Sequence, residues 1–254
     1  MRVFITGASS GIGAALAREY AAQGATLGLV ARRREQLDAL AASLPGQHKV
    51  YALDVTDHAA LAGAAADFIA SFGGADVVIA NAGVSHGTIT EMAADLPVFE
   101  TIIATNVTAT VATFSPFIAA MKAQATPARL VGIGSVAGIR GLPGAGAYSA
   151  SKAAVISYCE SLRLELSRTQ IKVVTIAPGY IATPMTAKNS YPMPFLMPVE
   201  KFAAQAVRAI TRGTSYQVIP WQMGVVAKLL RALPNFLYDL AFSRAPHKAR
   251  KAAP

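Results

Sequence analysis

The hydrophobic residues of this chain follow two alternating patterns from the N-terminus to about residue 220. Short apolar runs rich in β-branched residues have the length of buried strands, and the longer Ala- and Leu-rich stretches between them have a helical period. The predicted strands are 2–6, 26–31, 49–53, 76–80, 129–134, 171–177 and 216–219, and the predicted helices are 11–23, 34–43, 57–72, 96–122, 147–168 and 199–212. Fully apolar strands separated by helices indicate a parallel sheet covered on both faces. We therefore expect a single doubly wound α/β domain with a seven-stranded parallel sheet.

The pattern changes after residue 220, which divides the chain into a main domain of residues 1–220 and a C-terminal extension of residues 221–254. Apolar residues between Val225 and Leu233 recur at helical spacing, which predicts one short amphipathic helix over 225–233. Pro234 ends this helix, and residues 235–242 predict a second apolar turn or two before a polar, basic end.

Composition and charge narrow the class of protein. The single cysteine, Cys159, and four scattered histidines predict neither a disulfide nor a metal site. The N-terminus enters a strand pattern at once and no run reaches about 20 uninterrupted apolar residues, so we expect no signal peptide, no spanning helix and a cytoplasmic location. The net charge is +9, and the extension carries six of the Lys and Arg residues against the one acid Asp239. Aromatics on a basic sheet, zinc-finger spacing and basic heptads are all missing, so this charge does not indicate nucleic-acid binding.

The segment TGASSGIG joins the first predicted strand to the first helix. Glycine permits a tight turn and lets backbone N–H groups approach a phosphate, which the helix N-terminus also favours. The glycine spacing differs from the dinucleotide-binding pattern G-x-G-x-x-G, so only the physical mechanism of phosphate binding applies here. We expect the pyrophosphate of a dinucleotide to bind here, at Gly7, Ser9, Ser10, Gly11, Ile12 and Gly13. The alternative is a plain Gly-rich turn.

The end of the second strand indicates which dinucleotide binds. Ala31 stands where an acidic residue would hold an unphosphorylated ribose, and three arginines follow it. Guanidinium groups at the N-terminus of a helix oppose its dipole, so we expect an anion beside them. The 2′-phosphate of NADP(H) would supply that anion, at Arg32 and Arg33, while Arg34 faces outward. The alternative is a solvated, basic helix start.

The stretch GAYSASK places Tyr148 and Lys152 one turn apart on a predicted helix. Together with the Gly-rich segment, the chain carries ANAG at 80–83, Asn106, GSVAG at 134–138, YSASK at 148–152 and PGYIAT at 178–183. Over residues 1 to about 220 it therefore resembles the short-chain dehydrogenase/reductase family. The resemblance implies a Rossmann-type fold and an NAD(P)-dependent oxidoreductase. It also implies a catalytic set of Asn106, Ser135, Tyr148 and Lys152.

The chemistry of this set follows from its residue types. A phenol titrates near about 10 in water, so Tyr148 needs its anion favoured if it is to exchange a proton near neutral pH. Lys152 supplies a cation for this, and Ser135 can donate a hydrogen bond to a carbonyl oxygen. The resemblance adds that Lys152 holds the nicotinamide ribose and that Asn106 places a water which links Lys152 to solvent.

The resemblance also implies further cofactor contacts. Asp54 and Val55 would meet the adenine, and Asn81, Ala82 and Gly83 would pack along the cofactor. The loop after the sixth strand would bind the carboxamide and pyrophosphate through Pro178, Gly179, Ile181 and Thr183. For Asp54 the alternative is a cap on the following helix. Cys159, in an Ala- and Ile-rich helix, is expected to be a buried, inert thiol.

In this family the substrate pocket is walled by the segment between Ser135 and Tyr148 and by the loop after the sixth strand. Here these segments supply mostly apolar side chains: Ile139, Leu142, Met185, Tyr191, Met193, Phe195, Leu196 and Met197. We therefore expect NADP(H)-dependent hydride transfer to or from a hydrophobic carbonyl or alcohol. The alternatives are a 3-oxoacyl-thioester reductase that meets an acyl carrier, and a non-catalytic NADP-binding sensor or scaffold.

Two kinds of association are also expected. Helices 96–122 and 147–168 carry more apolar surface than one sheet face covers, and the resemblance implies pairing through them, as a homodimer or, alternatively, a tetramer. For the extension, one interpretation is that it packs over the substrate cleft. The other is peripheral contact with an anionic membrane, with Trp221, Phe236, Tyr238 and Phe242 at the interface and the basic residues near the headgroups.

Overall fold

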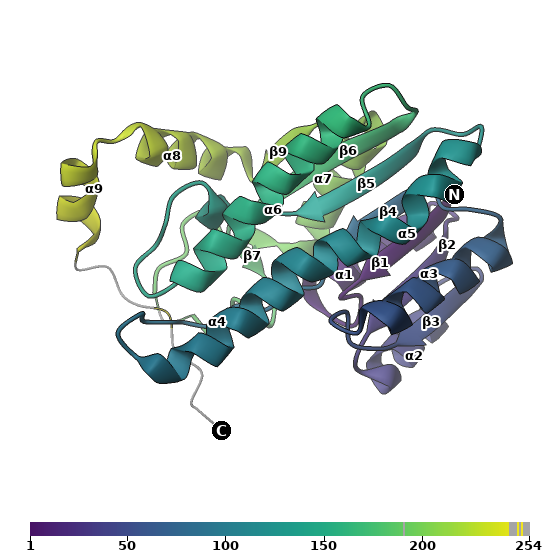
Figure 1. Ribbon diagram of the computed structural model, residues 1–254, viewed down its shortest axis with the longest axis horizontal. Helices are drawn as coiled ribbons and strands as arrows, with labels where there is room; N and C mark the ends of the chain where they lie inside the picture. Colours follow the sequence, from purple (N-terminus) through teal and green to yellow (C-terminus); the bar gives the residue numbers. More distant parts are fainter. Residues whose placement is uncertain (190, 244–247, 249, 251–254) are drawn as a thin grey trace.

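A seven-stranded parallel sheet forms the centre of the protein (Figure 1). The computed structural model describes residues 1–189, 191–243, 248 and 250. The strands are β1 (Arg2–Thr6), β2 (Thr26–Ala31), β3 (His48–Ala52), β4 (Val77–Ala80), β5 (Ala128–Ile133), β6 (Ile171–Pro178) and β9 (Tyr216–Ile219). Their order is β3-β2-β1-β4-β5-β6-β9, which reverses direction between β1 and β4. The predicted doubly wound α/β fold is confirmed, and a crevice is expected at the carboxyl ends of the strands at that reversal.

Helices cover both faces of the sheet, as the fully apolar strands predict. One face carries α1 (Gly11–Ala22), α2 (Arg34–Ser43) and α7 (Val199–Arg212), and the other carries α3 (His58–Phe72), α5 (Ala109–Ala123) and α6 (Gly146–Glu165). Leu16 and Phe202 are fully buried in the first layer, and Phe68 and Phe117 in the second. The two apolar layers fix the carboxyl edge of the sheet as a rigid base for a ligand site.

The helix predicted over 96–122 is interrupted. It begins as α4 (Leu96–Ile103), after a short 3₁₀ turn η1 (Ala93–Asp95), and continues as α5 only after a π-helical turn η2 (Ala104–Thr108). Asn106 lies in this wide turn and is buried. The apolar period runs unbroken through the turn, so the pattern alone does not reveal it. Such single turns inside α-helices are frequent at functional sites.

The combined helical stretch Ala93–Ala123 spans 31 residues and is, by length and mean hydropathy, apolar enough to cross a membrane. Core helices of globular domains satisfy the same test. Phe114, Phe117 and Met121 of this stretch are fully buried in the core layer against the sheet. Its apolar character is therefore explained in part by packing, with Phe99 and Val111 left exposed.

The C-terminal extension forms two helices, α8 (Trp221–Ala232) and α9 (Asn235–Phe242), which project at one end of the molecule (Figure 1). The first helix begins at Trp221, one turn before the predicted start at Val225. A Cβ on Gly179, which follows β6, would lie 2.7 Å from the Met223 side chain and 3.2 Å from the Pro220 ring, so the glycine lets the start of α8 pack closely against the domain. A small second sheet, β7 (Ile181–Ala182) with β8 (Met197–Pro198), lies between these parts in the sequence.

Candidate active site

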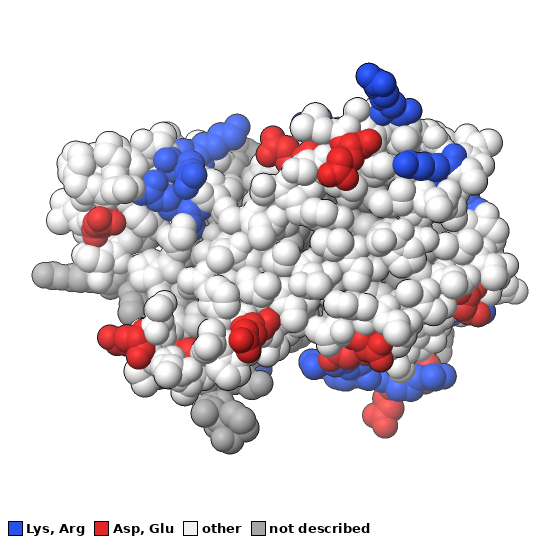
Figure 2. Space-filling model, viewed as in Figure 1, with Lys and Arg blue, Asp and Glu red and all other residues white. Residues whose placement is uncertain are grey.

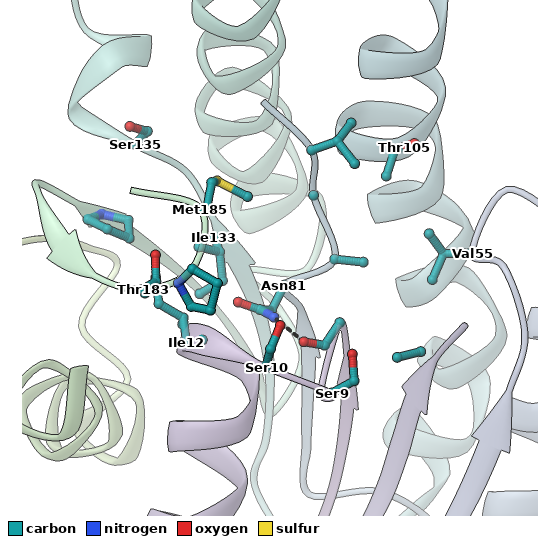
Figure 3. A pocket seen from close by; sticks show the side chains of 18 of the residues that line it. Ser9, Ser10, Ile12, Val55, Asn81, Thr105, Ile133, Ser135, Thr183 and Met185 are labelled. Carbon is teal, nitrogen blue, oxygen red and sulfur yellow. Dashed lines mark hydrogen bonds between the residues drawn. The ribbon is translucent and has the colours of Figure 1, made fainter. Parts of the chain in front are cut away.

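A cleft opens at the carboxyl edge of the sheet, and most of the candidate residues line it (Figure 3). The predicted catalytic and cofactor-binding residues that line the cleft are Gly7, Ser9, Ser10, Gly11, Ile12, Arg32, Arg33, Asp54, Val55, Asn81, Ala82, Gly83, Ser135, Tyr148, Lys152, Pro178, Gly179, Ile181 and Thr183. Gly13 and Asn106 are the two candidates that do not line it. Thr101, Thr105 and Val84 also line the cleft and were not predicted. The first two reach it from α4 and its π-helical turn, which the sequence pattern did not reveal.

The Gly-rich segment is shaped by close backbone approach. Gly7 and Gly11 have φ of 68° and 55°, a region that favours glycine. A Cβ on Gly13 would lie 2.3 Å from the Gly7 carbonyl oxygen, so Gly13 acts behind the cleft by letting α1 approach the loop. The Asn81 amide donates to the carbonyl oxygens of Thr6 (2.9 Å) and Gly7 (3.2 Å) and thereby fixes the loop.

The start of α1 fits an anion. Ser10 is the N-cap residue, but its side chain makes no capping hydrogen bond to the first turn of the helix. The first N–H groups of a helix have no partner within the helix, and together with its dipole they favour a phosphate. Ser9, Ser10 and Ile12 line the cleft beside these groups (Figure 3). The backbone N–H groups at the start of α1 therefore suit the pyrophosphate of a dinucleotide.

The three arginines after β2 have different roles. Arg33 donates from one guanidinium nitrogen to the hydroxyls of Ser9 and Ser10, both at 2.9 Å. Arg32 is largely exposed and lies 3.6 Å from the Asp54 carboxylate. Arg34 pairs with Asp38 one turn along α2 and does not line the cleft, as expected of an outward-facing residue. The guanidinium that meets the Gly-rich loop is therefore that of Arg33.

Asp54 is not the cap of the following helix, so that alternative is wrong. The N-cap of α3 is Asp57, whose side chain accepts from the Ala60 N–H at 2.9 Å. Asp54 instead accepts from the backbone N–H (3.0 Å) and hydroxyl (2.8 Å) of Thr56. The backbone hydrogen bond is the main reason that its pKa lies below the ordinary value. Asp54 is thus held as a carboxylate at the cleft, next to Val55.

Ser135, Tyr148 and Lys152 meet at the other end of the cleft. Ser135 ends the segment after β5 and caps a 3₁₀ turn, η3 (Val136–Gly138), by accepting from the Ala137 N–H at 3.1 Å. Burial raises the pKa of Tyr148, and a hydrogen bond with Ser135 acts in the opposite direction. The Lys152 ammonium lies 5.9 Å from the centre of the Tyr148 ring. The serine and tyrosine hydroxyls can therefore contact the same small group.

Lys152 is a buried cation. It is 5% exposed, and its ammonium donates to the Ile133 carbonyl oxygen at 2.8 Å. Burial lowers the pKa of Lys152 to about 8. At neutral pH most Lys152 side chains are therefore protonated, and the burial of this charge costs free energy. The nearby Cys159 is buried, and burial raises the pKa of its thiol to about 11, as expected of an inert thiol.

Asn106 acts from behind the cleft. Its side chain accepts from the Val84 N–H (2.8 Å) and donates to the Val84 carbonyl oxygen (3.0 Å) and the Ser151 hydroxyl (2.9 Å). A Cβ on Gly83 would lie 3.2 Å from the Asn106 side-chain oxygen and 3.6 Å from the Lys152 ammonium. The amide thus ties the segment after β4 to α6 and holds it against Lys152.

The expected apolar wall is placed differently from the prediction. Of its eight residues, Met185 alone is among those that line the cleft. Met197 is buried within β8, and Phe195 and Leu196 are exposed. Burial, with smaller effects from Tyr180 and Tyr148, raises the pKa of Tyr191. The pairing of β7 with β8 decides which side of this loop faces the cleft, and no local pattern encodes that pairing.

Lys248 and Arg250 of the extension contact residues near the site, which the sequence did not predict. The Lys248 ammonium donates to the Ser85 hydroxyl at 2.6 Å and lies 5.4 Å from the centre of the Tyr148 ring. Arg250 makes two hydrogen bonds of 2.8 Å to the Asp95 carboxylate. The interpretation that basic residues of the extension meet lipid headgroups therefore does not extend to these two. No spacing or composition signal identifies contacts between residues so far apart in the chain.

Comparison with known proteins gives a consistent match. The family model described as short chain dehydrogenase matches residues 1–193. An uncharacterized oxidoreductase of Myxococcus xanthus is 39% identical over 243 residues, covering 94% of this chain and 95% of that protein. The 11-beta-hydroxysteroid dehydrogenase-like 2 protein of Arabidopsis thaliana is 35% identical over 252 residues, covering 94% of this chain and 81% of that protein.

Solved structures share the fold. The 3-ketoacyl-(acyl-carrier-protein) reductase of Brucella melitensis complexed with NADH has a TM-score of 0.78 at 24% identity, over 86% of this chain and 96% of that one. The alcohol dehydrogenase of Thermococcus sibiricus complexed with 5-hydroxy-NADP has a TM-score of 0.77 at 25% identity, over 86% of this chain and 95% of that one. These neighbours bind different nicotinamide cofactors, so the fold by itself does not choose between them.

Replacing Lys152 with Met should change how stability depends on pH. The pKa of Lys152 is about 8 in the folded chain, below its ordinary value, so between these values the unfolded chain binds more protons. The free energy of unfolding of the wild type should therefore rise with pH relative to the variant, by about 1–3 kcal/mol between pH 7.5 and 10. Urea denaturation at a series of pH values measures this difference. Lys228→Met, at an exposed position in α8, is the matched control. If the difference in unfolding free energy between the wild type and Lys152→Met does not change with pH, the pKa of Lys152 is not lowered in the folded chain.

Proposed function

Because this chain belongs to the short-chain dehydrogenase family, we propose that it is an NADP(H)-dependent oxidoreductase that interconverts a lipophilic carbonyl compound and its alcohol. The observation that carries the proposal is the convergence of Ser135, Tyr148 and Lys152 at one end of a cleft whose other end suits a dinucleotide. A non-catalytic sensor or scaffold would need only the dinucleotide end. The second end is the reason to prefer an enzyme.

The residues divide the chemistry between them. NADP(H), when bound, supplies or accepts the hydride. The Ser135 hydroxyl donates to the carbonyl oxygen of the substrate and stabilises the negative charge that develops there. The Tyr148 phenol, whose pKa is raised by burial, stays protonated at neutral pH and gives its proton to the same oxygen during reduction. In oxidation it takes the proton back, with the Lys152 charge favouring its anion.

Support for NADP(H) comes from Arg33. The guanidinium and the Ser9 and Ser10 hydroxyls form a group of donors at the rim of the cleft. Ala31 at the end of β2 offers no carboxylate to a ribose hydroxyl. A phosphate at this place would accept from all three side chains, and Arg is the side chain best suited to hold it.

Support for a lipophilic substrate comes from the side chains beside the reacting hydroxyls. Val84, Ile133 and Met185 are among the residues that line the cleft, and among the described lining residues only Asp54, at the dinucleotide end, carries a carboxylate. An apolar wall with few polar groups suits a hydrophobic ligand held by its carbonyl. The name of the Arabidopsis relative, a hydroxysteroid dehydrogenase-like protein, agrees with this class of substrate.

A substrate screen tests the proposed function. NADPH oxidation is followed with aliphatic ketones and aldehydes of rising chain length and, in parallel, with 3-oxoacyl thioesters. We expect kcat/KM to rise with chain length among the ketones and aldehydes. Turnover confined to the thioesters would favour the acyl-carrier reductase instead, and no turnover with either class would favour the sensor or scaffold.

The variant Tyr148→Phe should lose turnover and keep cofactor binding. Only the hydroxyl that exchanges the proton is removed, so kcat should fall at least about 100-fold. The dissociation constant for NADPH, measured by fluorescence titration, should stay within about threefold. Tyr216→Phe, at the exposed start of β9, is the control and should keep its activity. An active Tyr148→Phe protein would contradict the assigned role.

The preference for NADP(H) should depend on Arg33. The wild type should bind NADPH at least about tenfold more tightly than NADH, and Arg33→Gln should remove most of that ratio because the phosphate loses its charged partner. Arg34→Gln, which breaks only the exposed pair with Asp38, should keep the ratio. Isothermal titration of the two cofactors against each protein measures this. Equal affinities in the wild type, or an unchanged ratio in Arg33→Gln, would refute the proposed phosphate site.

We also propose that two copies of the chain pair through α4, α5 and α6, as a homodimer. Phe99 and Val111 stay 39% and 37% exposed on the long apolar stretch that begins at α4. Light scattering at micromolar concentration should give the mass of a dimer, and Val111→Glu should shift it toward a monomer because it buries a charge in the interface. Lys201→Glu, on the exposed side of α7, should leave the mass unchanged. A monomeric wild type would contradict the pairing.

A further inference from the structure

The helix α8 exposes an apolar face. Trp221, Val225 and Leu229 are 67%, 48% and 64% exposed. They recur every four residues, so they share one side of the helix, and this side lies opposite the buried Met223 and Ala227. The apolar stripe of this helix therefore points away from the domain, and core packing does not account for it.

The helix α9 repeats this arrangement. Its one buried residue is Tyr238, whose hydroxyl donates to the Gly141 carbonyl oxygen at 2.5 Å. Phe236 and Leu240, two positions before and after Tyr238, are 70% and 81% exposed on the opposite side of the helix. Leu237 adds a further exposed apolar side chain. Contacts on its inner side thus fix the orientation in which α9 presents these residues.

Cations flank the two apolar faces. Lys228 and Arg231 are exposed on α8, and Asp239 is the only acidic residue in the two helices. Arg140 stands at the corner between them, where its guanidinium donates to the Asn235 side chain at 3.0 Å and lies 4.2 Å from the centre of the Tyr238 ring. Figure 2 shows Lys and Arg side chains gathered over this end of the molecule, beside surface that carries no charge.

We propose that the exposed faces of α8 and α9 dock on an anionic lipid surface. Aromatic and aliphatic side chains on one side of a short helix, with cations beside them, are the features of a helix that lies in a membrane interface. Each cation near an anionic leaflet adds to the attraction, and Lys and Arg can place their apolar stems along the lipid while their charges meet headgroups. Lys228, Arg231 and Arg140 lie beside the apolar faces of α8 and α9, where their charges can meet lipid headgroups.

A second copy of the chain fits the same faces less well. Pairing of identical patches would bring the Lys228 and Arg231 of one copy toward a patch of the same sign. The only acid that this segment could offer in return is Asp239. An anionic lipid surface provides the complementary charge that a second copy lacks.

The docking faces are joined directly to the proposed substrate site. Arg140 and Gly141, which hold α9, belong to the loop between Ser135 and Tyr148. Further along the extension, Lys248 lies over the Tyr148 ring. Docking would therefore hold the loop that precedes Tyr148 close to the lipid, where a lipophilic substrate dissolves, a consequence that rests on the proposed function, whereas lipid binding itself does not.

Sedimentation with vesicles tests the docking without using turnover. Full-length protein is spun with phosphatidylcholine vesicles that contain or lack phosphatidylserine, at low salt and at about 0.5 M salt. The proposal predicts binding to the anionic vesicles at low salt that weakens at high salt. The double variant Leu229→Glu, Leu240→Glu should bind at least about tenfold less well, since it places charges in both apolar faces.

A matched double variant, Ala39→Glu, Ala62→Glu, makes the same change in charge at exposed positions on α2 and α3, away from both the docking faces and the proposed dimer interface. It should bind vesicles as the wild type does, and circular dichroism and light scattering confirm the fold and mass of each protein. A wild type that stays in the supernatant at low salt overturns the proposal, as does an equal loss of binding in both double variants. A third outcome is that the wild type does not bind vesicles and that Leu229→Glu, Leu240→Glu lowers the mass in solution. The two faces then form a protein interface, and lipid docking is wrong.

Discussion

The buried ammonium of Lys152 is the constraint on which the site depends. An unpaired cation away from water is costly, and here it donates to one backbone carbonyl, that of Ile133 at the end of β5. Such a hydrogen bond can form only if α6 lies close to the sheet edge. Gly138 permits this approach, because a Cβ there would lie 2.6 Å from the Lys152 backbone carbon. Burial at that position lowers the pKa of Lys152, and it places a cation at the reacting end of the cleft.

The same requirement explains the buried polar residues around Lys152. Asn106 and Ser151 form a hydrogen-bonded link between the segment after β4 and α6, and the π-helical turn in the long helix turns Asn106 into position for it. Val84 is held by two hydrogen bonds to the same amide. These contacts lie behind the cleft, so they position the residues that face it. At the opposite end Asn81 fixes the Gly-rich loop in the same way.

Several contacts of the described residues tie the C-terminal extension to the active-site side of the molecule, among them the Lys248–Ser85 hydrogen bond. Arg140 and Gly141 hold α9 at the loop that precedes Tyr148, and Arg250 pairs with Asp95. A disturbance of α8 and α9 would therefore be transmitted to the loop that borders Ser135 and Tyr148. This connection links the surface of the extension to the loop beside the reacting residues.

The sequence by itself determined the sheet, its flanking helices and the identity of most residues in the cleft. Apolar period and glycine placement are local properties, and in a parallel doubly wound sheet they send every strand end to the same edge. The strands at 26–31 and 171–177 were predicted within a residue of their observed bounds, and Tyr148 and Lys152 follow from spacing within one helix. The sequence could not distinguish Arg32 from Arg33, because both follow the strand, and only the fold places Ser9 and Ser10 beside one of them. Tertiary structure also decided the π-helical turn at Asn106, the direction in which the loop around Phe195 faces, and the contact of Lys248 with Ser85. Each of these depends on a partner far away in the chain, and a pattern read along the sequence carries no information about which distant residue that partner is.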